Sequence, residues 1–100
     1  MINALKYSLL LISLLIHFKT IANNAYEDAV KSFHKQNYST TIIHLKNALK
    51  EDIDHIPSRI LLTETLIAQG KGEMAETELY DLQASGVDFN QIIALLAQSL

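Results

Sequence analysis

The sequence has 100 residues, which is enough for one domain but too few for two. Hydrophobic residues make up 49% and charged residues 19%, with one Pro and three Gly, so the composition argues against a disordered chain and favours a mostly helical fold. A net charge of −3 without a basic cluster argues against nucleic-acid binding. The lack of Cys excludes disulfides, thiolate metal sites and a Cys nucleophile.

The start of the sequence has the layout of an export signal. Lys6 precedes an uncharged apolar run over residues 7–16, and Lys19 follows that run. The short segment between the two lysines would span about 18 Å as a helix, against about 30 Å for the membrane interior. Residues 1–22 are therefore predicted to be a signal peptide cleaved after Ala22, with an uncleaved membrane anchor as the alternative. Cleavage removes two lysines and no acid, which changes the net charge from −3 to −5 and predicts a periplasmic or secreted product.

A repeat of 34 residues organises the predicted mature region, residues 23–100. Shifting the sequence by 34 positions superimposes similar residues, in the pairs Ala29/Thr63, Phe33/Ile67, Thr41/Ala75, Leu45/Leu79 and Ala48/Leu82. Small residues at fixed places in a unit of this length let stacked helix hairpins approach closely. The sequence predicts an all-α fold of antiparallel hairpins: two repeats over residues 25–54 and 57–86, and the first helix of a third over residues 89–100, which has no partner.

Turn and capping residues fall at the expected helix ends. These signals are a break at Gln36-Asn37, a helix cap at Ser39, Pro57 in a first helical turn, a turn at Gly70-Lys71-Gly72, a stop at Gly86, and a cap at Asp88 or Asn90.

These residues resemble the tetratricopeptide repeat (TPR) family. The resemblance rests on Lys35-Gln36-Asn37-Tyr38, Thr41, Leu45, Ala48, Leu49, Leu62, Leu66, Ala68, Gly70, Ala75 and Leu79, and covers residues 25–100. It implies a right-handed solenoid of stacked hairpins that binds a partner on its concave face. Asp28 and Ser32 depart from the family pattern because bulky apolar residues are usual at their positions, so the first repeat is expected to be frayed or to act as a cap.

A closer resemblance is to the amino-terminal repeats of the TPR lipoproteins of exosortase (PEP-CTERM) systems. The stretches that carry it are residues 26–29, 33–38, 45–50, 58–62 and 75–79. It implies a role in exopolysaccharide export or in sorting proteins with a carboxy-terminal anchor. No Cys follows the apolar segment here, unlike in a lipoprotein, and the apolar stretch from Ala94 to Leu100 suggests a fragment of a longer repeat array. Sealing of the second hairpin by this last helix, or pairing with a second copy, is the alternative.

Catalytic and metal sites are not predicted, and no cofactor is expected. His34, His44 and His55 lie ten and eleven residues apart, which fits neither a helical zinc pair nor a short chelating motif. Ser58, His55 and Asp54 are the residue types of a hydrolase triad, but neighbours along a linker rarely form one, and no nucleophile turn surrounds them.

A binding surface is the remaining expectation. In stacked hairpins the first helix of each unit lines the concave face, so the candidates are Tyr26, Val30, Phe33 and His34 from the first repeat, and Ile60, Glu64, Ile67 and Ala68 from the second. The set is mostly apolar and holds none of the Lys and Asn residues with which some TPR proteins grip a terminal carboxylate. An extended or helical protein segment is therefore the predicted partner.

Three functions fit these observations. The first, which we favour, is a non-catalytic protein-binding scaffold of the bacterial cell envelope. The second is the amino-terminal repeat segment of a longer protein whose activity lies beyond residue 100. The third is a small membrane-anchored adaptor that keeps its apolar segment.

Overall fold

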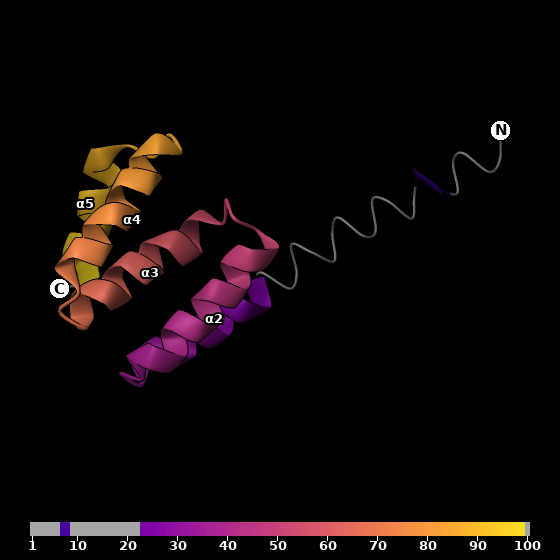
Figure 1. The fold of residues 1–100 in the computed structure, drawn as a ribbon, viewed down its shortest axis with the longest axis horizontal. Helices are drawn as coiled ribbons and strands as arrows, with labels where there is room; N and C mark the ends of the chain where they lie inside the picture. Colours follow the sequence, from indigo (N-terminus) through magenta and orange to yellow (C-terminus); the bar gives the residue numbers. More distant parts are fainter. Residues whose placement is uncertain (1–6, 9–22, 100) are drawn as a thin grey trace.

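The computed structural model describes residues 7–8 and 23–99, and the secondary structure of these residues is helical, with no strand among them. A helix over residues 23–34 precedes α2 (Tyr38–Glu51), α3 (Ile56–Ala68), α4 (Gly72–Ala84) and α5 (Phe89–Ser99). Figure 1 shows α3 between α2 on one side and α4 on the other, with the helix over residues 23–34 alongside α2. The fold is thus all-α and resembles a helical repeat. The predicted signal peptide and its cleavage site at Ala22 lie outside the described residues, residues 7–8 excepted.

The turns that end the helices share one geometry. Gln36, Gly70 and Gly86 adopt positive φ angles of 59°, 74° and 93°. One residue after each, a backbone N–H donates to a carbonyl five positions back, as Asn37 does to Ser32 at 2.9 Å and Lys71 does to Leu66 at 2.8 Å. This pattern satisfies carbonyls that a helix end would otherwise leave unpaired. The first two turns lie 34 residues apart, which is the period found in the sequence.

The predicted capping residues were right at three places and wrong at one. Pro57 lies in the first turn of α3, Gly86 follows α4, and the Asp88 carboxylate accepts the Asn90 N–H at 3.0 Å where α5 begins. Ser39 does not cap α2, because the helix already begins at Tyr38. The turn at Gln36 sets this start, since it leaves a single residue before helical geometry resumes.

The core lies between the helix over residues 23–34, α2, α3 and α4. Its buried cluster consists of Ala29, Leu45, Leu61, Leu62, Leu66 and Ala75. Ala29 and Ala75 let helices approach closely, and the leucines fill the space between them. Helix α3 is the most enclosed element: the hydroxyls of its buried Thr63 and Thr65 bond to carbonyls one turn back, at 2.9 and 2.6 Å.

The two ends of the stack differ in character. On the first hairpin, Ser32 is buried and its hydroxyl lies 2.9 Å from that of Thr41, so a hydrogen bond takes the place of apolar packing. At the other end, α5 was expected to have no partner, but it packs against α3 with Ile92 fully buried. Phe89 and Ile93 on α5 remain 46% and 47% exposed.

No helix within residues 7–8 and 23–99 combines the length and apolar character that a membrane crossing requires.

Candidate functional site

A groove of about 330 Å³ lies between the helix over residues 23–34 and the first three turns of α3. We call it the inner groove; it is lined by Tyr26, Ile56, Pro57, Ile60, Leu61 and Glu64. Three of the eight residues predicted to bind a partner, Tyr26, Ile60 and Glu64, therefore meet here. They come from the first helices of the two hairpins, as the repeat pattern predicted.

The other five predicted residues lie elsewhere. Val30 and Phe33 are partly buried and pack against the core cluster, and the Phe33 ring centroid is 5.6 Å from that of Tyr38. His34 and Ala68 are exposed, and Ile67 is 40% exposed near the end of α3. None of these five lines the inner groove.

The inner groove holds a carboxylate without a cation. The ion pairs within the described residues all use Arg59, and Glu64 takes part in none of them. Partial burial raises the pKa of Glu64 above its ordinary value. The pKa of Tyr26 is raised as well, first by burial and then by the negative charge of Glu64. A negative potential therefore faces an otherwise apolar surface.

A hydrogen-bonded group fixes one end of the inner groove. The Nε2 atom of His55 lies 3.0 Å from Oδ1 of Asn23, and its Nδ1 atom lies 2.6 Å from Oγ of Ser58. The Tyr26 ring packs edge-on against the same imidazole, with 5.5 Å between centroids. Sequence analysis considered Ser58 and His55 as parts of a triad and missed Asn23. Because Ser58 is fully buried at the start of α3, its hydroxyl is not presented to a substrate, and the group ties α3 to the preceding hairpin.

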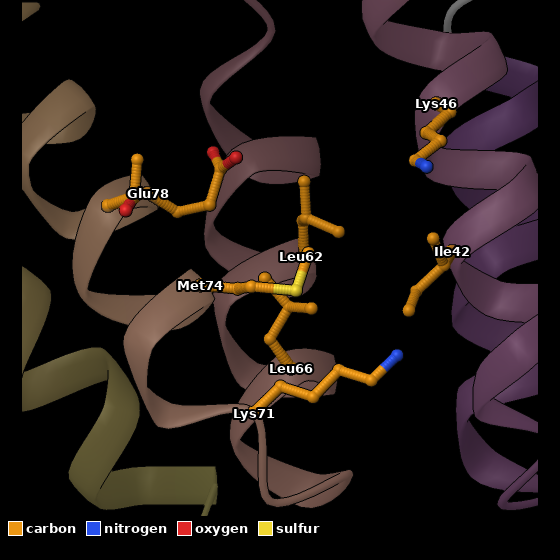
Figure 2. Close-up of a pocket in the computed structure, with 8 residues that line it drawn as sticks. Ile42, Lys46, Leu62, Leu66, Lys71, Met74 and Glu78 are labelled. Atoms are coloured by element: carbon orange, nitrogen blue, oxygen red, sulfur yellow. The ribbon is translucent and has the colours of Figure 1, made fainter.

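A second groove, which the sequence analysis missed, crosses the opposite side of α3. We call it the outer groove; its volume is about 260 Å³ and its lining residues are Ile42, Lys46, Leu62, Leu66, Lys71, Met74, Thr77 and Glu78. Figure 2 shows α2 on one side, α4 on the other, and the leucines of α3 between them.

Arg59 holds the acidic residues of α4 next to α3. Its Nη1 atom lies 3.6 Å from Oε2 of Glu78 and 3.9 Å from Oδ2 of Asp81, and its Nε–H donates to the Ile53 carbonyl at 2.9 Å. The Glu78 Oε2 atom is buried and, at 3.6 Å, is ion-paired without being hydrogen-bonded. Burial accordingly raises the pKa of Glu78 more than the Arg59 charge lowers it.

A third hollow, of about 410 Å³, is polar and lies on the outer face of the first hairpin. Its lining residues are Asp28, Lys31, Ser32, Lys35, Asn37, Thr40 and His44. Across residues 7–8 and 23–99, no three His, Asp or Glu side chains converge as a metal-binding group would.

Comparison with protein-family models, with curated proteins and with solved structures found no match to this chain.

Proposed function

We propose that the chain is a non-catalytic protein-interaction module that binds a segment of a partner protein along the inner groove. The observation that carries this proposal is the meeting of Tyr26, Ile60 and Glu64 in one concavity between the first helices of two hairpins. Such a groove suits an extended or helical segment, since it offers apolar area along the length of two helices.

The chemistry of the groove indicates what the partner carries. Ile56, Pro57 and Ile60 favour an apolar side chain, and Glu64 adds a partly buried negative charge without a cation. A lysine, an arginine or a free amino terminus beside the apolar side chain would supply that cation and lower the cost of burying the carboxylate. The preferred partner is therefore a basic and apolar segment.

The repeat architecture extends the same proposal. The recurrence of the turn after 34 residues and the packing of α3 against its neighbours support a TPR-like right-handed solenoid. We propose the cell envelope as its location, in exopolysaccharide export or in the sorting of anchored proteins, on the strength of the apolar amino-terminal segment and the sequence resemblance.

Paired substitutions in the full chain test the inner groove. The probe is a fluorescent amphipathic peptide with leucine at helical spacing and lysine at the other positions, and its binding is followed by polarisation. Tyr26→Ala combined with Ile60→Ser should abolish binding, and Glu64→Gln should weaken it about tenfold through loss of a charge-assisted contact. The matched control, Tyr80→Ala with Ile43→Ser, makes the same changes at sites that are 62% and 59% exposed and outside the groove. Equal binding by all variants of unchanged helicity would reject the inner groove.

The location is tested separately. Expression with an export pathway, followed by intact-mass measurement of the soluble and membrane fractions, should yield a soluble product that begins at Asn23. Full-length protein in the membrane fraction would instead support the anchored adaptor.

A further inference from the structure

The outer groove faces away from the inner one, because α3 contributes opposite faces to the two. Leu62 and Leu66 lie one turn apart and line the outer groove, whereas Ile60 and Glu64 line the inner groove. At about 100° of helical rotation per residue, residues two positions apart lie about 200° apart around the axis. A ligand in one groove therefore leaves the other open.

The floor of the outer groove is apolar and its far wall is adaptable. Leu62 and Leu66 are 6% and 3% exposed, so the floor is supported by the core. Ile42 and Met74 close it from α2 and α4, and Met74 is 55% exposed. A flexible, polarisable thioether in this position adjusts to incoming side chains of different shape.

The rim of the groove is positive. Lys46 and Lys71 are both exposed, and neither lies within ion-pair distance of an acid among the described residues. Figure 2 shows their amino groups on either side of Ile42. Glu78 is the acid at the opposite wall, and Arg59 balances its charge. The open side of the groove thus presents two uncompensated cations over an apolar floor.

We propose that the outer groove binds an acidic amphipathic segment of a second partner protein. Apolar side chains of that segment cover Leu62 and Leu66, while its carboxylates pair with Lys46 and Lys71. The charge pattern selects an anionic partner, because an apolar surface between two cations rejects a basic segment. The volume of about 260 Å³ accommodates side chains of a segment laid across the groove but lies below the range, from about 300 Å³ upward, in which whole small molecules are enclosed.

Met74 provides a direct readout. The sequence contains two methionines, Met1 and Met74, so methyl labelling of methionine gives a simple NMR spectrum, and Met74→Leu assigns the groove signal. The probe is a blocked amphipathic peptide with leucine at helical spacing and glutamate elsewhere, added to the full chain. We expect a saturable shift of the Met74 methyl signal, and no such shift with the peptide in which lysine replaces every glutamate.

Charge reversal completes the test. Lys46→Glu with Lys71→Glu should weaken binding of the acidic peptide about tenfold or more, since two favourable contacts become repulsive. Lys35→Glu with Lys50→Glu changes the net charge equally on lysines that do not line the groove, and should leave the affinity within about twofold. Unchanged circular dichroism establishes that all variants are folded.

Four results would overturn the proposal. These are no Met74 shift up to about 1 mM peptide, equal shifts with the acidic and basic peptides, equal losses for the two lysine pairs, and a Met74 signal that moves on dilution of the protein alone. The last result would assign the groove to a second copy of the chain. Loss of acidic-peptide binding by the Tyr26 and Ile60 variant would also contradict a separate site.

Discussion

Truncation of Leu45 and of Leu79 tests the arrangement of the hairpins most directly. The 34-residue repeat makes these two leucines equivalent, since each occupies the same place in the second helix of its hairpin. The structure distinguishes them: Leu45 is fully buried in the core cluster, whereas Leu79 is only partly buried. The same substitution at both positions, Leu45→Ala and Leu79→Ala, therefore measures how much each hairpin is enclosed by its neighbours.

The expected losses follow from burial. A fully buried Leu→Ala change costs about 2–5 kcal/mol, because transfer energy and packing around the cavity are both lost. Leu45 has α3 on one side and the helix over residues 23–34 on the other, so little collapse is available and we expect about 3 kcal/mol. At Leu79, solvent already covers part of the side chain, and about 1 kcal/mol is expected. For a small domain with a total stability near about 5 kcal/mol, the first loss removes more than half.

Urea unfolding of the full chain, followed by far-UV circular dichroism, measures both losses. The midpoint should fall much further for Leu45→Ala than for Leu79→Ala, with the dependence on urea unchanged, because the substitutions alter stability rather than compactness. Equal losses, or a larger loss at Leu79, would refute the packing of α2 between the helix over residues 23–34 and α3.

Three further predictions concern single sites. Ala75→Trp should cost about 1–3 kcal/mol by overpacking the α3–α4 interface, whereas Ala84→Trp at an exposed position should leave the urea midpoint nearly unchanged. Gln36→Gly should stabilise the chain by about 0.5–1 kcal/mol, because a side chain is strained at a φ of 59°; a lower thermal midpoint would contradict this. Glu64→Gln should stabilise the protein at neutral pH. Since burial raises the folded pKa of Glu64, its ionisation costs stability as pH rises from the ordinary value of 4.5 through the folded pKa, and unfolding curves across that range should be flatter in the variant, with the residual slope including the raised pKa of Glu78.

Much of the local structure was predictable because single residues determine it. Gly70 and Gly86 adopt the left-handed conformation that ends a helix, and Pro57 occupies a first turn where no N–H is needed. Gln36 takes the same conformation as Gly70 without being glycine, so the repeat revealed this turn although residue type alone is a weaker signal. The Ser39 cap was wrong for a related reason: the turn geometry sets where α2 begins.

The grooves were less predictable because they depend on packing between helices. Tyr26, Ile60 and Glu64 could be found from their places in the first helices of the hairpins. Phe33 could not be placed, because an aromatic residue near a helix end fits a core position as well as a groove. In the sequence, Lys46 and Lys71 look like ordinary solvent-facing lysines. Their significance arises when packing of α2 and α4 on α3 brings both to the rim of one apolar surface.

The two proposed sites share α3, and this determines which substitutions can separate them. Leu61 lines the inner groove and Leu62 the outer groove, yet both belong to the same core cluster. A cavity at either leucine would loosen α3 and weaken both sites together, so loss of binding would not identify the groove involved. Glu64 belongs to one groove and Lys46 to the other, and each charge can be reversed without removing core packing. If basic and acidic segments bind where we propose, reversal at Glu64 impairs only the first and reversal at Lys46 only the second.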